Sequence, residues 1–437
     1  MYIKNKTLQF FAGNPFLVAL TFALGMCLFA PTLALASQTV GLSASGRFTL
    51  PYRIVQLAVA CLLVVTIVHR GRWRINGYIV AGLAFWAMYI VRVVVEGQRD
   101  GVIDNRTWVA FLGFCLVAVL SPAFSAGFRY TQKEGETAFK TLFFFLGLSG
   151  VVLLIVFREQ IGVGYRMATY QGFAEDAVIS PLAFSYTGAH LICLSIYQIW
   201  RRDKMTTLIW IWVAVSFFMG AALLTVGEAR NALVSIAAVL VLLLTVTPKG
   251  GETKREGSRW AVVLGSVVFA ATLYASMAFM QTGLPERINK LVEESWARDE
   301  NAGSGRLGIW TRGLAQFRES PWLGCGIKEE VVQYSAHNLY LESFMATGVM
   351  GGTIVLVLTF AGVVKARRLL RERPGLGWLS VLLVEKAASG FVSTSVVEFE
   401  FWVPLFAVFA NDILRGADVA PALRADSSYP RGSRIIK

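Results

Sequence analysis

The chain has 437 residues, of which 55% are hydrophobic and only 16% charged, and its mean hydropathy is +0.57. Soluble domains usually carry about 25% charged residues. This composition excludes a soluble multidomain protein, a disordered chain and a disulfide-stabilised scaffold. Apolar runs of about 20 residues, long enough to cross a bilayer core of about 30 Å, recur along the chain. We therefore predict an all-α polytopic membrane protein.

Hydropathy predicts about twelve transmembrane helices. The expected spans are 14–35, 51–69, 77–95, 107–127, 138–157, 177–199, 206–227, 230–247, 259–280, 338–364, 376–395 and 398–414. They give transmembrane helices 1–9 in residues 1–280, a long loop with short helices at 281–337, transmembrane helices 10–12 in 338–414 and a tail at 415–437. The first span also resembles a signal peptide ending at Ala34-Leu35-Ala36, but its apolar run is long for one, so an uncleaved span is preferred.

The basic residues indicate which side of the membrane each loop faces. One set of alternate loops, with the two termini, holds 25 of the 41 Lys and Arg residues but only nine of the 28 Asp and Glu residues. Loops rich in Lys and Arg face the cytoplasm, so both termini are expected there and the loop at 281–337 faces the periplasm. The net charge of +13 is then an orientation signal. Membrane lipids are expected as partners, and nucleic acid is not.

The basic residues outside the cytoplasmic set are mostly arginines, 13 of 16. Arginine presents a planar fork that binds phosphate through two hydrogen bonds. Several of them lie near predicted span ends: Arg53, Arg92, Arg158, Arg166 and Arg230. Arg230 lies in a tight turn with little room for a loop. Each could instead only reach the interface and pair with a nearby acid. Together, these arginines indicate a site for a large anion at the membrane surface.

Of the three histidines, His337 is the best candidate for chemistry. It lies at the external start of the span 338–364, where free N–H groups and positive potential keep an imidazole neutral and able to accept a proton. The alternative is a histidine that only caps the helix. His190 is interpreted as a hydrogen-bonded residue inside the bundle. A zinc site is not expected, because it needs several ligands and only one histidine is external.

Two further pairs have structural interpretations. Glu398 and Glu400 are two residues apart, so on a helix they do not share a face, and a solvated rim is preferred to a divalent-cation site. Gly348 and Gly352 form a GxxxG pattern, which predicts close packing by another helix.

Three short motifs follow one another within about 45 residues. They are Arg306-Leu307-Gly308-Ile309-Trp310, Ser320-Pro321-Trp322-Leu323-Gly324-Cys325-Gly326, and His337-Asn338-Leu339-Tyr340-Leu341 with Gly348 beyond it. This order resembles the signature of the O-antigen ligase and polymerase superfamily. Arg230 resembles the arginine that follows an apolar span in these proteins, although Ala229 stands where a serine often precedes it.

The resemblance implies a GT-C-like helical glycosyltransferase of the bacterial inner membrane, in lipopolysaccharide biosynthesis. The donor would be a glycan on undecaprenyl pyrophosphate, and the acceptor a sugar hydroxyl of the lipid A–core oligosaccharide. The active site would face the periplasm and use neither a metal nor another cofactor, and the reaction would invert the anomeric centre. His337 would be the general base, and Arg166 and Arg230 would bind the pyrophosphate. Secondary candidates for substrate contact are Arg306, Arg312, Arg53 and Asn338, of which Asn338 would orient His337 or the sugar.

Two other functions remain open at this point. The first is another enzyme of the same superfamily with a different acceptor: an O-antigen or polysaccharide polymerase, or a protein O-oligosaccharyltransferase. The second, of a different class, is a lipid or glycan transporter, which would move the lipid without breaking its pyrophosphate bond. None of the motifs names the acceptor.

Overall fold

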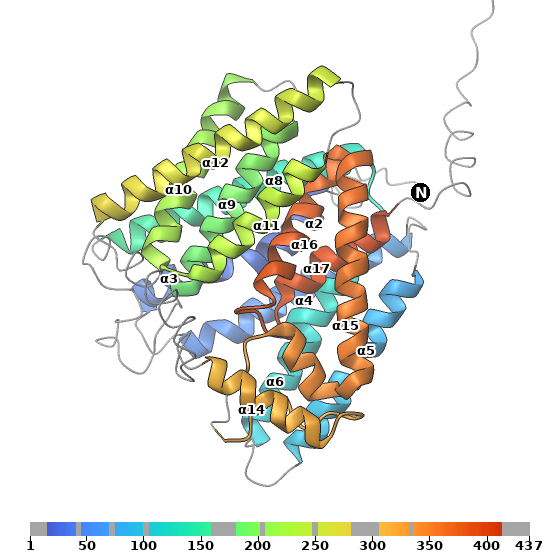
Figure 1. Cartoon of the computed structure of the whole chain (residues 1–437). Helices are drawn as coiled ribbons and strands as arrows, with labels where there is room; N and C mark the ends of the chain where they lie inside the picture. The colour runs from blue at the N-terminus through green and yellow to red at the C-terminus, as the bar shows by residue number, and fades with distance from the viewer. Residues whose placement is uncertain are drawn as a thin grey trace, which may run out of the picture.

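The computed structural model describes residues 15–40, 45–69, 75–98, 105–158, 181–201, 206–246, 252–280, 306–331 and 335–412. These residues fold into a bundle of helices (Figure 1). The first half of the bundle is formed by α2 (Pro15–Met26), α3 (Phe29–Val40), α4 (Ser45–His69), α5 (Gly77–Gly97), α6 (Asn105–Gly113), the π-helical η2 (Phe114–Leu120), α7 (Ser121–Ala126) and α8 (Gln132–Val156). The second half is formed by α9 (Pro181–Arg201), α10 (Thr207–Gly227), α11 (Arg230–Thr245), α12 (Glu252–Met280), α14 (Arg306–Glu319), α15 (Leu339–Glu372), the 3-10 turn η5 (Pro374–Leu376), α16 (Gly377–Ser389) and α17 (Phe399–Asn411).

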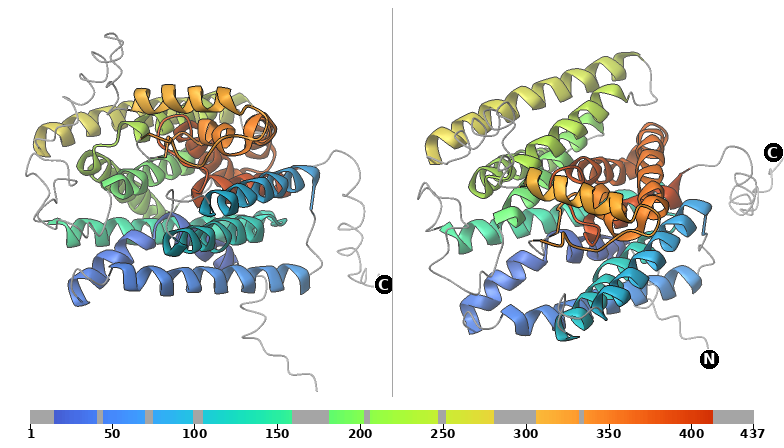
Figure 2. Two further views of the ribbon diagram at one scale, coloured as in Figure 1. Left: turned by 90° about the horizontal axis from the view of Figure 1, so that it is seen from below. Right: turned by 60° about the horizontal axis from the view of Figure 1, so that its bottom comes forward.

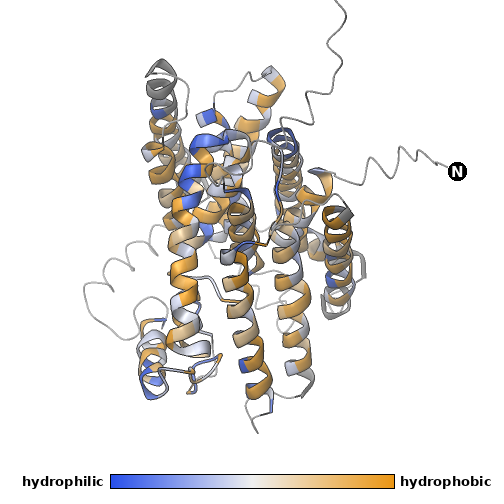
Figure 3. Cartoon of the chain, turned by 90° about the vertical axis from the view of Figure 1, so that its right-hand side faces the viewer, coloured by the Kyte–Doolittle hydropathy of each residue, from blue (hydrophilic) through white to orange (hydrophobic). Residues whose placement is uncertain are grey.

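Seven of the described helices are long and apolar enough to cross a membrane, and an eighth crossing is possible if α2 and α3, bent by 67°, form one span. The long helices are hydrophobic over most of their length (Figure 3). The chain is therefore a polytopic helical membrane protein. The expected count of twelve crossings is not reached among the described residues, where the further apolar segments Asn231–Thr245, Val262–Ala275 (a part of α12) and Phe399–Asn411 are each shorter than 18 residues.

The helices differ in how deeply they lie in the bundle. The apolar window of α9 is 78% buried, whereas that of α4 is 28% buried, so α9 is central and α4 is peripheral. Two glycines let α9 and α10 approach closely. A Cβ atom on Gly188 would lie 2.5 Å from the Gly220 carbonyl oxygen, so nothing larger than glycine fits there without a shift.

Segments that the charge pattern assigns to the cytoplasm meet at one end of the bundle. Asn411 accepts a hydrogen bond from the Tyr130 N–H at 2.8 Å and donates one to the Phe128 carbonyl at 2.9 Å. Arg201 pairs with Glu136 at 3.2 Å. These contacts close the end of the bundle opposite His337, and they agree with the predicted alternation of the loops.

The C-terminal helices depart from the predicted spans. The expected span 376–395 is wrong at its end, because α16 stops at Ser389 and the chain runs in turns from 390 to 398 before α17. The sequence there contains Ser393-Thr394-Ser395, whose hydroxyl groups compete with helical hydrogen bonds. With 13 residues, α16 is about 20 Å long, which is shorter than the bilayer core. The turns at 390–398 bind Asn338 and Leu339, the two residues that follow His337.

Helix α15 is broken at Gly348, where φ is +67° and ψ is −165°. The loop that follows α14 fills the break: the Cys325 N–H donates to the Met345 carbonyl at 2.7 Å, and the Val349 N–H donates to the Pro321 carbonyl at 2.7 Å. Gly348 was expected to let another helix pack closely, and this is wrong, because the segment that packs against it is the loop. A Cβ atom at Gly348 would lie 2.1 Å from the carbonyl oxygen of Trp322, in the loop.

Helix α14 lies across the end of α15 rather than along it, as both views in Figure 2 show. A small core joins the two elements, and its buried members Leu341 and Met345 pack against Ile309, Trp310 and Phe317. The Trp310 indole N–H also donates to the Ala336 carbonyl at 2.8 Å. Helix α14 therefore fixes the backbone immediately before His337.

Candidate functional site

His337 lies in the turn that enters α15, at the end of the bundle covered by α14. Its φ is +47°, a left-handed conformation that non-glycine residues rarely adopt. Its backbone N–H donates to Glu342 Oε1 at 2.8 Å and to Ser335 Oγ at 3.3 Å. Burial lowers the pKa of the His337 imidazole, and the nearby positive charge of Arg306 lowers it further. The imidazole is therefore neutral near pH 7 and able to accept a proton.

Asn338 caps α15, because its side chain accepts the N–H groups of Tyr340 at 3.2 Å and Leu341 at 3.1 Å. Its amide Nδ2 donates to the Phe391 carbonyl at 3.0 Å. The cap of α15 is therefore Asn338 and not His337, which was the alternative role considered for the histidine. Asn338 also ties the start of the helix to the turns at 390–398.

Arg306, at the start of α14, points at the same turns. Its guanidinium donates to the Val392 carbonyl oxygen and, at 3.4 Å, to Ser393 Oγ. The structure thus brings three of the predicted site residues together around 390–398: His337, Asn338 and Arg306.

Two other predicted arginines are engaged elsewhere. Arg312, two turns along α14, pairs with the buried carboxylate of Glu329 at 3.1 Å, and its own side chain is 42% exposed. Arg53 on α4 donates to Gln56 at 2.9 Å, and its guanidinium carbon lies 4.8 Å from the Phe29 ring centroid and 4.9 Å from that of Phe114. The partners of Arg53 come from α3, α4 and η2, which do not include the elements around His337.

The two predicted pyrophosphate-binding arginines are described only in part. Arg166 lies outside the described residues. Arg230 is the first residue of α11, after a turn of only two residues, but its side chain is not among those described. Its neighbour Asn231 donates to the Tyr186 hydroxyl at 2.6 Å, and that hydroxyl donates to the Ser393 carbonyl at 3.4 Å. The start of α11 is therefore joined through Tyr186 to the turns that hold Arg306.

Arg92 was predicted only as one of the external arginines at span ends, and Glu342 was not predicted at all. Arg92, on α5, donates to the carbonyl groups of Ala346 at 2.9 Å, Leu323 at 2.9 Å and Gly324, and so holds the loop in the break of α15. Glu342 is buried in the first turn of α15. An ionisable residue inside a predicted span was the signal that could have identified Glu342.

A second polar cluster lies inside the bundle. His190 Nδ1 lies 2.7 Å from Glu385 Oε1, its Nε2 lies 3.7 Å from Glu400 Oε2, and the ammonium of Lys386 contacts the same Glu400 oxygen. The interpretation of His190 as a residue inside the bundle is confirmed, and it pairs there with Glu385. That of Glu400 as part of a solvated rim is wrong, because buried partners on α9 and α16 hold its carboxylate. Charges inside a bundle need such partners.

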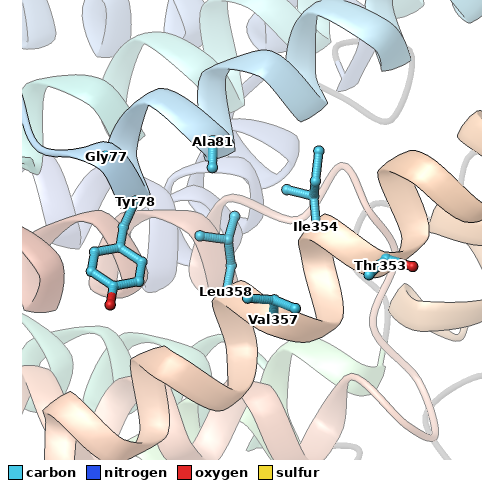
Figure 4. Close-up of a pocket in the computed structure, with 7 residues that line it drawn as sticks. All are labelled: Gly77, Tyr78, Ala81, Thr353, Ile354, Val357 and Leu358. Atoms are coloured by element: carbon cyan, nitrogen blue, oxygen red, sulfur yellow. The ribbon is translucent and has the colours of Figure 1, made fainter.

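An apolar groove between α5 and α15 lies on another part of the molecule (Figure 4). Tyr78 and Ala81 line one side, and Ile354, Val357 and Leu358 the other. None of the predicted site residues lines this groove. Its surface suits contact with acyl chains more than polar chemistry.

In the described parts of the chain, no group of three or more His, Cys, Asp or Glu residues is arranged to hold a metal ion.

These features define a polytopic helical membrane protein with a neutral histidine beside an arginine at one end of its bundle. Residues 215–356 match the family model described as O-antigen ligase. The match covers about a third of the chain, and it supports the resemblance to the O-antigen ligase family seen in the motifs. The matched region runs from α10 into α15 and includes Arg230, Arg306 and His337. Comparisons with curated proteins and with solved structures gave no match.

Proposed function

We propose that the protein is an O-antigen ligase of the bacterial inner membrane, with its active site facing the periplasm. It transfers a glycan from undecaprenyl pyrophosphate to a sugar hydroxyl of the lipid A–core oligosaccharide. The observation that supports this most directly is the neutral His337 beside Arg306, within the region that matches the family. A proton acceptor next to a cation suits attack by a hydroxyl on a substrate that carries a phosphate leaving group.

The proposed step is a single displacement. The acceptor hydroxyl oxygen attacks the anomeric carbon, the bond from that carbon to the pyrophosphate oxygen breaks, and the hydroxyl proton passes to the His337 imidazole. Undecaprenyl pyrophosphate leaves with the electron pair of the broken bond. Attack from the face opposite the leaving group inverts the anomeric centre. General-base assistance of this kind is worth roughly 10²–10⁴ in rate.

Arginine residues would stabilise the charge that develops on the leaving group. Arg230 and Arg166 are proposed to bind the pyrophosphate, and the link from Asn231 through Tyr186 to Ser393 supports this role for the start of α11. Arg306 is the arginine whose charge acts on His337, so it is proposed to contact the donor phosphate near the base.

The other residues have smaller proposed roles. Asn338 orients the start of α15 and, through it, His337. Arg312 and Arg53 remain secondary, because the partners that the structure shows for them, Glu329 and Gln56, lie outside the turns at 390–398 that hold Arg306. A GT-C-like architecture and twelve crossings also belong to this proposal.

The acceptor separates this function from the other candidates. A polymerase or a protein O-oligosaccharyltransferase would use the same donor with another acceptor, and a transporter would leave the pyrophosphate bond intact. The test is to reconstitute the protein with lipid-linked glycan, a chelator, and lipid A–core present or absent. The expected result is a lipid A–core of increased mass and release of undecaprenyl pyrophosphate only when the acceptor is present. Glycan chain growth without lipid A–core, or no bond cleavage, contradicts the ligase.

A further inference from the structure

We propose that Glu342 is a positioning residue that holds the base His337 in register with Arg306; this inference rests on the proposed function. Glu342 lies one turn into α15 and only 4% of its surface is exposed. It is not assigned to proton transfer. Its role is to fix two segments that converge at the site.

Each carboxylate oxygen of Glu342 binds a different segment. Oε1 accepts the backbone N–H of His337 at 2.8 Å and the hydroxyl of Ser335. Oε2 accepts the Ser395 hydroxyl at 2.6 Å and the Val396 N–H at 2.9 Å. One side chain therefore joins the turn that carries the base to the turns at 390–398.

The turns at 390–398 also hold the arginine. Arg306 donates to the Val392 carbonyl and to Ser393 Oγ, and these residues lie three and two positions before Ser395. Asn338 binds the same turns through the Phe391 carbonyl at 3.0 Å. Glu342 thus sets the distance between the backbone of His337 and the backbone that anchors Arg306.

The backbone conformation of His337 gives Glu342 a second effect. A left-handed φ of +47° is unfavourable for histidine, and such a conformation persists only when its surroundings hold it. The hydrogen bond from the His337 N–H to Glu342 is a direct restraint on that peptide unit. Without it, the turn can relax and carry the imidazole away from the acceptor.

A carboxylate is required by the pattern of donors. All four partners donate hydrogen bonds, and an ionised carboxylate accepts at both oxygens without presenting a proton. A glutamine amide has the same shape, but its NH2 group would face two donors. Glu342→Gln therefore disturbs either the His337 side or the 390–398 side while it keeps the volume of the side chain.

The experiment measures glycan transfer by wild type, Glu342→Gln, His337→Ala and the double variant, each purified in detergent and reconstituted. Ser343→Ala is the matched control, since Ser343 is buried in the same turn of α15 and, among the described residues, its hydroxyl bonds only the Leu339 carbonyl of its own helix, at 2.6 Å. Thermal unfolding shows whether each variant is folded, and transfer rates are expressed per amount of folded protein.

We expect Glu342→Gln to lower kcat by about 10- to 10²-fold, the scale of an error in placement, with little change in the KM for the donor. In the His337→Ala background the same change should have almost no effect, because the two residues act as one unit. Ser343→Ala should transfer as wild type does.

Several outcomes overturn the proposal while the proposed function stands. They are a wild-type kcat in Glu342→Gln, a raised donor KM with unchanged kcat, or an equal loss in the presence and absence of His337. If the His337→Ala rate is below detection, the split between kcat and KM decides. A wild-type protein that transfers no glycan refutes the proposed function itself and is thereby distinguished from these results.

Discussion

The guanidinium group of Arg306 lies close enough to the imidazole of His337 to lower its pKa, in addition to the larger effect of burial. A general base must be neutral, so activity should rise with pH as His337 loses its proton. Because the folded-state pKa is below the ordinary value of 6.5, the acidic limb of the kcat/KM profile should lie below pH 6.5. A pH profile of the reconstituted enzyme measures this.

Replacing Arg306 should move that limb. Arg306→Gln removes the nearby positive charge, so the pKa of His337 should rise and the acidic limb should shift to higher pH, beside any loss of substrate contact. Arg318→Gln, an exposed arginine on the same helix, is the control and should leave the limb in place. A limb that stays fixed in Arg306→Gln would mean that another group titrates.

The planar guanidinium group of Arg230 is predicted to contribute to glycan transfer through its shape as well as through its charge. Arg230→Ala and Arg230→Lys should both lower transfer, by about 10²-fold for alanine and less for lysine, because lysine cannot make the bidentate contact. Transfer rates and donor KM for both variants measure this. Arg259→Ala, an exposed residue at the predicted cytoplasmic side, should transfer normally. Full recovery of activity by lysine would argue for charge alone.

Gly348 is predicted to be irreplaceable for folding. Alanine there would need a φ of +67° and would place its Cβ 2.1 Å from the Trp322 carbonyl oxygen, so the loop or the helix must shift. Gly348→Ala should give a lower melting temperature and little folded protein. Gly113→Ala is the comparison, since its Cβ would meet nothing within 4 Å. Equal melting temperatures of the two variants would refute the proposed need for glycine at 348.

The buried cluster on α9, α16 and α17 is predicted to stabilise the bundle. Lys386 is fully buried and contacts Glu400, whose side chain is 17% exposed, so Lys386→Met leaves a largely buried carboxylate without its cation and should cost up to about 3–5 kcal/mol. The double variant Lys386→Met/Glu400→Gln should recover part of that loss. Unfolding of the purified variants in detergent measures both. A double variant that is less stable than Lys386→Met would contradict this account of the cluster.

The fold was predictable where local composition decides it. Apolar runs longer than 18 residues determine helices such as α5, α8 and α10, and the positive charges of the loops agree with the contacts at one end of the bundle. The end of α16 was not predictable from hydropathy, because the residues after Ser389 are apolar enough to continue a span. Their hydrogen bonds to Glu342, Arg306 and Asn338 instead hold them in turns.

The site was only partly predictable, because it joins segments that lie far apart in the sequence. The motif residues His337, Asn338 and Arg306 do meet, although 31 positions separate the first and last of them. Their common anchor at 390–398 follows in the chain only after the whole of α15 and α16. Such a contact between distant segments leaves no periodic pattern in the sequence, which is why Glu342 was missed.

The most direct measurement is glycan transfer by His337→Ala in protein shown to be folded and inserted in the membrane. If a neutral imidazole takes the acceptor proton, the rate should fall by at least about 10²-fold, while binding of the lipid-linked donor persists. A His337→Ala variant that transfers glycan to lipid A–core at near the wild-type rate would contradict the proposed mechanism.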